Sequence, residues 1–380
     1  MEKAKNTAVI ILFVVIIFGL GIGFFVMPDV RHSRTERRLL AQLPTFNSET
    51  ILSGSASYAF EEYMQDQFPF RETFRTINTV VRLYGLWMRD YNDYFFANGH
   101  LSKMEHPLDN AAVDRNAAWL NSVSRQFFTG MNVFYAIIPD KNYFLAENNG
   151  FLALDYHEMQ NIFHRRMGSH TFIDLFDVMS LDTFYRTDLH WRQEALFPVA
   201  ERLAEVMGVE MPSYELFTPN ALSPFNGGLR GHSALPVRAD ELIFMTSRYT
   251  ENAIVHTLIE TGGQFKFTHY IDVYGESLRL EVYNPALFYG LDSYDVFLAG
   301  AQAVMTIEVP NAASDRELII FRDSFGSSIA PLLLGAYSKI TLVDIRYIPS
   351  RLLPNFIYFE DQDILFLYSA SILNRRDLLR

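Results

Sequence analysis

The feature that most constrains this chain is an uncharged apolar stretch near its N-terminus, from Ala8 to Met27 (AVIILFVVIIFGLGIGFFVM). About 20 residues, rising roughly 1.5 Å each, span the roughly 30 Å hydrocarbon core of a bilayer. A cleaved signal peptide usually has a shorter apolar core that ends at a small-x-small site. Gly21-Ile22-Gly23 weakly resembles such a site, but apolar residues continue past it. The sequence therefore predicts a membrane anchor over residues 1–28, with cleavage as the alternative.

The charges that flank this stretch bear on its orientation. Two lysines precede it and four arginines follow it closely: Lys3, Lys5, Arg31, Arg34, Arg37 and Arg38. Positive charge is enriched in cytoplasmic loops, so this distribution by itself would keep the rest of the chain in the cytoplasm.

Composition excludes several classes of protein. Of 380 residues, 49% are hydrophobic and 15% aromatic, which argues against disorder and favours one large domain, alone or with a small companion. The formal net charge of −12 makes nucleic acid an unsuitable partner, because phosphate backbones are bound by basic surfaces. Cysteine is absent, so disulfides, thiolate zinc sites and a cysteine nucleophile are excluded.

Apolar runs after the anchor alternate between the periods of strands and helices. Residues 29–57 are polar and basic and predict a juxtamembrane linker, followed by an α/β domain over residues 58–380 with an insertion at about 214–290. The predicted strands are the apolar runs Val133–Ile138, Val296–Leu298, Leu318–Phe321, Ile340–Ile345 and Ile364–Tyr368. Residues 192–207 have helical spacing, and another helix-length apolar stretch follows Gly326. This alternation indicates a mostly parallel sheet covered on both faces.

Two short segments carry groups suited to acyl transfer. Asp188 and His190 precede a predicted helix, and Ser324 lies between a predicted strand and a helix. A serine at that place would lie beside helix N–H groups that can bind developing negative charge. In an extended segment, residues two apart point the same way, so Asp188 could orient His190 as a base for Ser324. Each segment also has a purely structural interpretation, as a helix cap or an ordinary turn.

Together, Thr187-Asp188-Leu189-His190-Trp191 and Asp323-Ser324-Phe325 resemble the DHHW-type proteins and the alginate O-acetylation proteins, relatives of the SGNH (GDSL-like) hydrolase superfamily. Further similar segments are RRLLAQLP at 37–44, DQFPFR at 66–71, IPDK at 138–141 and DQDILFLYS at 361–369. The resemblance implies a three-layer α/β fold outside the cytoplasmic membrane, and for that reason we expect an extracytoplasmic domain despite the flanking charges.

The same resemblance assigns roles to individual residues. Ser324 would be the nucleophile, His190 its general base and Asp188 the residue that orients His190. The oxyanion donor would be the Ser324 N–H, with Gly300 and Arg322 as further candidates. Trp191 and Lys141 are candidate substrate-binding residues, although Trp191 is better suited to packing and Lys141 to the surface.

This chain departs from the family pattern at two places. Leu189 replaces the histidine that gives the DHHW motif its name, at a position expected to face away from Ser324. Ala299-Gly300-Ala301-Gln302 lacks the asparagine that SGNH relatives commonly place near here as an oxyanion donor. The loss of one such donor costs on the order of a hundredfold in rate.

Two functions remain open at this point. The first is transfer or hydrolysis of an acyl group, most plausibly acetyl, on a cell-surface polysaccharide, with a membrane-bound acyltransferase as the donor partner and the bilayer bound through Ala8 to Met27. The second is a glycan-binding or assembly protein that has lost turnover. We expect no cofactor and no metal, because the histidines are scattered without ligand spacing.

Overall fold

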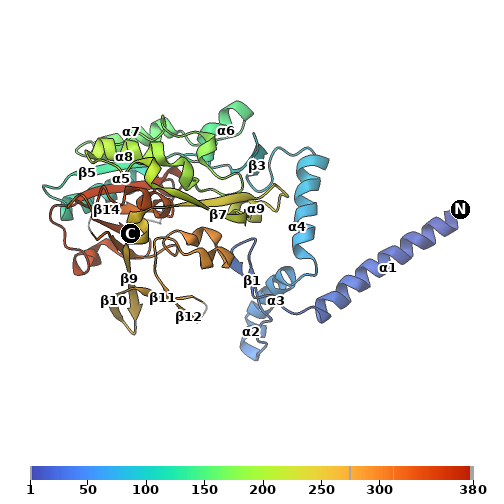
Figure 1. Ribbon diagram of the computed structural model, residues 1–380. Coiled ribbons are helices and arrows are strands. Elements are labelled where there is room, and N and C mark those ends of the chain that lie inside the picture. The colour runs from blue at the N-terminus through green and yellow to red at the C-terminus, as the bar shows by residue number, and fades with distance from the viewer. Residues whose placement is uncertain (1, 274, 311, 377–380) are drawn as a thin grey trace. The chain divides into compact units, whose positions relative to one another are not determined.

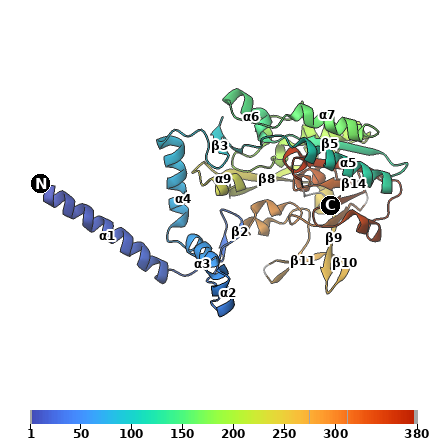
Figure 2. The same cartoon turned by 180° about the vertical axis from the view of Figure 1, so that it is seen from behind.

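The computed structural model describes residues 2–273, 275–310 and 312–376. The chain divides into two units, residues 1–91 with 230–236 and residues 92–229 with 237–380. Figures 1 and 2 show the elements of both units from opposite sides.

The first unit consists of one long helix followed by short elements. Its elements are α1 (Glu2–Val26), β1 (His32–Ser33), β2 (Arg38–Leu39), α2 (Ser48–Leu52), α3 (Ser55–Asp66), α4 (Arg71–Val80) and the π-helical turn η1 (Val81–Gly85). Helix α1 is long and apolar enough to cross a membrane, and none of its residues is buried.

The polar segment after α1 packs against α3. Asp66, at the end of α3, accepts hydrogen bonds from the Arg38 guanidinium at 2.5 and 2.8 Å and from the Ala41 N–H at 2.8 Å. Gln67 donates to the Val30 carbonyl at 2.9 Å. These bonds join residues 29–57, the predicted linker, to residues beyond 58 within the first unit, which runs to Tyr91.

The second unit is the α/β domain. Its strands are β3 (Tyr94–Ala97), β4 (His100–Lys103), β5 (Val133–Ile138), β6 (Thr171–Phe172), β7 (Thr218–Phe225), β8 (Asp240–Thr246), β9 (Ile254–Thr261), β10 (Gln264–Thr268), β11 (Tyr270–Val273), β12 (Glu276–Arg279), β13 (Val304–Glu308), β14 (Glu317–Arg322), β15 (Lys339–Val343) and β16 (Asp363–Ser369). Its α-helices are α5 (Asn110–Phe127), α6 (Lys141–Asn149), α7 (Tyr156–Met167), α8 (Phe197–Met207), α9 (Gly228–Ser233, which reaches into the first unit), α10 (Arg248–Glu251), α11 (Gly326–Ile329) and α12 (Ala370–Leu373). The 3-10 turns are η2 (Leu181–Thr183), η3 (Gln193–Ala195), η4 (Tyr214–Leu216), η5 (Pro285–Tyr289), η6 (Ser293–Val296), η7 (Ala330–Leu333) and η8 (Ser350–Asn355).

Within the described residues, the central sheet has eight strands in the order β10-β9-β13-β15-β14-β16-β5-β6. The strands from β15 to β6 are parallel to one another, and β13, β9 and β10 continue the sheet in antiparallel fashion. After β14 the chain continues to β15 on one side and then crosses to β16 on the other side. In open α/β sheets, ligands bind at the carboxyl ends of strands where the strand order reverses in this way.

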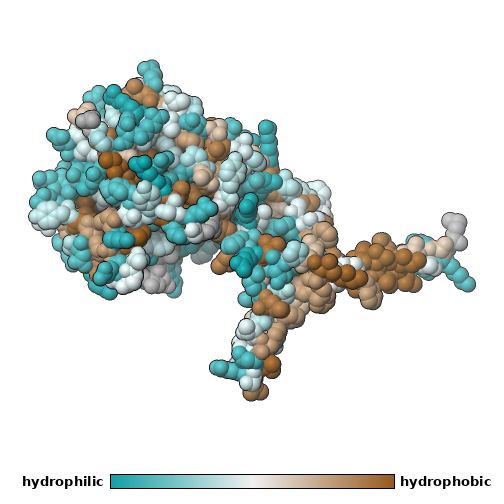
Figure 3. All heavy atoms as spheres, turned by 60° about the horizontal axis from the view of Figure 1, so that its bottom comes forward, coloured by the Kyte–Doolittle hydropathy of each residue, from teal (hydrophilic) through white to brown (hydrophobic). Residues whose placement is uncertain are grey.

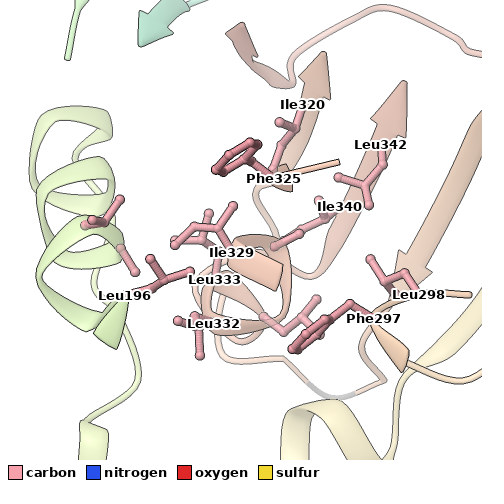
Figure 4. Close-up of a cluster of buried hydrophobic side chains, with 14 of the residues drawn as sticks. Leu196, Phe297, Leu298, Ile320, Phe325, Ile329, Leu332, Leu333, Ile340 and Leu342 are labelled. Carbon is pink, nitrogen blue, oxygen red and sulfur yellow. The ribbon is translucent and has the colours of Figure 1, made fainter. Parts of the chain in front are cut away.

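Alternate residues of the central strands form two separate hydrophobic cores. Ile320 of β14 and Leu367 of β16 belong to the core under α8, α11 and η7, whereas Phe321 and Phe366 belong to the core under α5 and α7. Figure 4 shows Leu196 and the α11–η7 side chains meeting the first of these faces. Each fully buried Leu, Ile or Phe stabilises the fold by about 1.5–3 kcal/mol. Two such cores explain why the strands are apolar on both faces.

These observations confirm the predicted α/β class with a mostly parallel, two-sided sheet and one N-terminal apolar helix. Two detailed predictions are wrong. Residues 296–298 are not a strand, because η6 ends at Val296 and Phe297 forms only an isolated bridge with Tyr283. The helix predicted over 192–207 is interrupted at Leu196, and α8 begins at Phe197 with Pro198 in its first turn. The predicted insertion contributes β9 and β10 to the central sheet.

Candidate active site

Ser324 lies in the turn between β14 and α11, at the carboxyl end of a central parallel strand. Asp323 holds this turn. One of its carboxylate oxygens accepts the Phe325 N–H at 3.0 Å, and the other accepts the Ser369 N–H at 2.8 Å and the Ser369 hydroxyl at 2.6 Å. Because Ser369 ends β16, these bonds fix the turn to the neighbouring strand. The predicted strand-to-helix setting of Ser324 is therefore present.

His190 connects Ser324 to a buried carboxylate. Its Nε2 lies 2.7 Å from Ser324 Oγ, and its Nδ1 lies 2.7 Å from Asp188 Oδ1. His190 and Asp188 are buried, whereas Ser324 is partly exposed. A serine hydroxyl can pass its proton to Nε2 in this arrangement, while Asp188 holds the imidazole in the tautomer that carries hydrogen on Nδ1. Residues 187–190 form a bend rather than an extended strand, and Asp188 Oδ1 also accepts the His190 N–H at 3.0 Å.

Two glycines shape the environment of Asp188. The Gly228 N–H donates to Asp188 Oδ2 at 2.6 Å, so this carboxylate accepts N–H groups at both oxygens. At Gly227, a β-carbon would lie 2.3 Å from the Thr187 carbonyl oxygen and 2.5 Å from Asp188 Cβ. Only glycine permits this close approach of the two backbones.

Asp240, at the start of β8, holds the same segment from its other side. It accepts the Thr187 N–H at 2.8 Å and the Thr187 hydroxyl at 2.6 Å, and that hydroxyl in turn accepts the Gly227 N–H at 3.0 Å. The Asp188 segment is thus positioned by two buried carboxylates, Asp188 and Asp240, and by backbone groups.

An aromatic side chain packs against one face of the His190 imidazole. The Tyr294 ring stacks on the His190 ring with centroids 3.9 Å apart and an interplanar angle of 7°. Its hydroxyl donates to Ser328 Oγ at 2.8 Å, and Trp191 Nε1 donates to the same oxygen at 2.7 Å. Trp191 is fully buried, so its contacts here are with protein atoms in the core.

The predicted oxyanion donors differ in their availability. Among the described residues, no acceptor takes the Ser324 N–H, whereas the following amides, those of Phe325 and Gly326, donate to Asp323. The Gly300 N–H donates to the Phe297 carbonyl at 3.1 Å. Gly300 has φ +79°, and a β-carbon there would lie 2.3 Å from an Asp295 carboxylate oxygen, so this glycine is required by its backbone and its packing. The geometry therefore favours the Ser324 amide.

Arg322 is fully buried at the end of β14. Its Nη1 donates to the Asp323 carbonyl at 3.3 Å, but Nε and Nη2 have no hydrogen-bond partner in the part of the chain that the structure describes. Burial lowers the pKa of its guanidinium, and Asp344 opposes that shift. A side chain with no exposed surface contacts no substrate in this conformation.

Lys141 is also buried, at the start of α6. Its Nζ donates to the Leu101 carbonyl at 2.8 Å and to the Arg186 carbonyl at 3.4 Å. Burial lowers the pKa of Lys141 to about 7, although the negative charges of Asp188 and Asp240 act to raise it. The structure therefore places Lys141 as a link between the β4 segment and the Asp188 segment, away from solvent.

Several residues of this site were not predicted from the sequence: Gly227, Gly228, Asp240, Tyr294 and Ser328. The Gly-Gly pair was a usable signal, because adjacent glycines mark a turn or a close backbone approach. Asp240 and Tyr294 are ordinary residues that lie far from Asp188 and Ser324 in sequence, and Ser328, four residues after Ser324, carries no motif of its own. Among the described residues, no group of three His, Asp or Glu side chains is placed to hold a metal ion.

Comparisons with known proteins bear on the fold. No family model and no curated protein sequence matches the chain. Among solved structures, a DHHW family protein from Eubacterium siraeum is similar with a TM-score of 0.57 and 18% identity, over 77% of this chain and 97% of that one. Bacillus cereus PatB1 with a sulfonyl adduct gives a TM-score of 0.56 and 15% identity, over 76% of this chain and 100% of that one. The O-acetyltransferase domain of Pseudomonas putida AlgJ gives a TM-score of 0.45 and 14% identity, over 75% of this chain and 94% of that one. The first two likenesses confirm, at the level of the fold, the predicted resemblance to DHHW-type proteins: the chain is similar in structure to a DHHW family protein.

Proposed function

We propose that this protein is an O-acyltransferase, or an esterase of the same chemistry, that acts on a cell-surface polysaccharide through Ser324. The observation that carries the proposal is the continuous line of hydrogen bonds from Asp188 through His190 to Ser324, each 2.7 Å long. Such a line is what a serine needs to act as a nucleophile at neutral pH.

In the proposed reaction, Ser324 Oγ attacks the carbonyl carbon of an acetyl donor while its proton passes to His190 Nε2. The Ser324 N–H donates to the oxyanion that forms, and the proton then goes from His190 to the departing donor oxygen. A sugar hydroxyl, activated by the same nitrogen, next attacks the acetyl-Ser324 ester and releases the serine. Water in place of the sugar would make the reaction a hydrolysis.

The sulfonyl adduct recorded for PatB1 supports this proposal by analogy, because sulfonylating reagents react with activated nucleophiles. The location is part of the proposal. Helix α1 would anchor the protein in the cell membrane with the α/β unit outside the cytoplasm, where a membrane-bound acyltransferase would supply the acetyl group. We also propose that residues 1–28 form the membrane anchor, residues 29–57 a linker and residues 58–380 the α/β domain. In the structure, residues 29–91 belong to the first unit.

A second candidate function is a binding protein without turnover. It is favoured by the oxyanion region, where the Gly300 N–H is already bonded to Phe297 and Arg322 is enclosed. A site with one oxyanion donor would be slow by on the order of a hundredfold.

The test uses the full chain in detergent with 4-nitrophenyl acetate and with a sulfonyl fluoride. We expect acetyl release, and a single sulfonyl group on Ser324 by mass spectrometry, both abolished in Ser324→Ala and strongly reduced in His190→Ala. Circular dichroism establishes that each variant is folded. A folded parent that is no faster than its variants in either reaction would leave the binding function as the better account.

A further inference from the structure

Helix α4 and the turn η1 carry a stripe of exposed apolar side chains. Phe74, Ile77, Val81 and Tyr84 recur at spacings of three and four residues, and Phe70 immediately precedes α4; the exposed fractions of Phe70, Phe74, Ile77, Val81 and Tyr84 are 63, 43, 52, 48 and 58%. Side chains at this spacing share one face of a helix. The stripe ends at Trp87, which is 84% exposed. Large apolar side chains gathered on one exposed face mark a surface that contacts another apolar phase.

The opposite face of α4 is held by specific hydrogen bonds. Arg75 Nη2 donates to the carbonyls of Gly231 and His232 at 2.9 and 3.1 Å, and the buried Thr79 hydroxyl donates to the Ser233 carbonyl at 2.9 Å. These bonds lie within the first unit and fix the rotation of α4 about its axis. Because these bonds hold the polar face of α4 against residues 231–233, the apolar stripe faces outward.

The end of α3 and the turn that leads into α4 lie against the last turn of α1. The Phe24 ring contacts the Tyr63 ring edge-on with centroids 5.6 Å apart, and a β-carbon at Gly23 would lie 3.3 Å from Pro69 Cγ. In Figure 3 the hydrophobic surface of α1 continues onto the neighbouring elements of this unit. If α1 crosses a bilayer, its last turn lies at the edge of the hydrocarbon, and the headgroup region extends about 5–8 Å beyond it. The Tyr63–Pro69 turn and the start of the stripe then fall within that region.

From these contacts we propose that α4 and η1 lie in the interface of the same bilayer that α1 spans, with the stripe from Phe70 to Trp87 inserted among the lipids. This rests on the anchor that forms part of the proposed function. An amphipathic helix with a polar, arginine-bearing face and an aromatic apolar face binds in this way. Aromatic side chains such as Trp87 and Tyr84 are favoured at the level of the headgroups. The first unit would thus hold the chain to the membrane at two places and restrict its tilt.

The test uses the full chain in nanodiscs of phosphatidylcholine and phosphatidylglycerol, with or without bromine on the acyl chains, which quenches nearby tryptophan. Emission from Trp87 is obtained by subtracting the emission of Trp87→Phe. We expect this component to be quenched by the brominated lipids. Ile77→Glu, in the stripe, should reduce the quenching. Thr76→Glu, adjacent in sequence but about 100° away around the helix, should leave it unchanged.

A second reporter separates this proposal from the anchor itself. Phe13→Trp, made together with Trp87→Phe, places a tryptophan in the middle of α1. Quenching of this reporter without quenching of Trp87 would leave the anchor in place and overturn the interfacial helix, with the stripe then facing protein. If neither reporter is quenched, the anchor is absent and the proposal falls with it. Equal quenching of Trp87 in Ile77→Glu and Thr76→Glu would also overturn it.

Discussion

Replacing Asp188 by asparagine should abolish most of the reactivity of Ser324 while leaving the fold in place. The Asp188 carboxylate accepts N–H groups at both oxygens, from Gly228 at Oδ2 and from the His190 backbone and ring at Oδ1. Asparagine has the same shape but only one acceptor oxygen. Its NH₂ group must therefore face either the Gly228 N–H or the N–H groups of His190, all of which are donors.

Each orientation of the asparagine has a definite cost. If its oxygen faces Gly228, the NH₂ group faces His190 Nδ1, so the ring must carry its hydrogen on Nε2 and can no longer take the proton of Ser324. If its oxygen faces His190, the NH₂ group meets the Gly228 N–H in a buried place, which costs about 1–3 kcal/mol. The wrong tautomer alone lowers turnover by about 10⁴-fold in a comparable triad.

We therefore expect Asp188→Asn to lower the rate of sulfonylation of Ser324 and of acetyl ester cleavage by about 10³-fold or more. ¹⁵N NMR of the histidine ring should show hydrogen moved from Nδ1 to Nε2. Thermal unfolding should show a loss of at most about 1–3 kcal/mol. A variant that keeps activity within about tenfold of the parent, with the parent's tautomer, would refute the role of Asp188 as the residue that orients His190.

Three other changes test the surroundings of the site. Gly227→Ala places a methyl group 2.3 Å from the Thr187 carbonyl oxygen, so both the unfolding free energy and the sulfonylation rate should fall; an unchanged unfolding midpoint would contradict the required close approach. Tyr294→Leu removes the ring stacked on His190 and should lower kcat/KM by up to about tenfold, whereas Tyr294→Phe keeps the ring and should lose less; equal losses would argue against the stack. Burial lowers the pKa of Lys141 to about 7, so between about pH 7 and 10 the folded state binds fewer protons than the unfolded state. The contribution of Lys141 to the free energy of unfolding should therefore rise with pH over that range. Denaturant titrations of the parent and of Lys141→Met should diverge across this window, and parallel curves would contradict the shift.

The fold class could be predicted because it follows from local pattern. The runs that became β5, β14 and β16 (133–138, 318–321 and 364–368) are apolar at every position, and the run that became β15 is interrupted only by Thr341 and Asp344, a pattern typical of strands covered on both faces. Their order in the sheet was not predictable, since pairing depends on contacts between distant segments. The strand expected at 296–298 failed for a related reason: a three-residue apolar run is also compatible with a buried turn, and Phe297 and Leu298 are buried without joining the sheet.

What the sequence by itself determined is the apolar N-terminal segment, the two-sided strands and the chemical types of Asp188, His190 and Ser324. Side-chain chemistry and hydrophobic period are properties of short segments, and they survive without knowledge of the fold. Only the tertiary structure decided that Nε2 of His190 meets Ser324, that Tyr294 stacks on that ring, and that Lys141 and Arg322 are enclosed. The contacts of His190 with Ser324 and with Tyr294 join segments more than 100 residues apart, and one sequence carries no record of which distant segments meet.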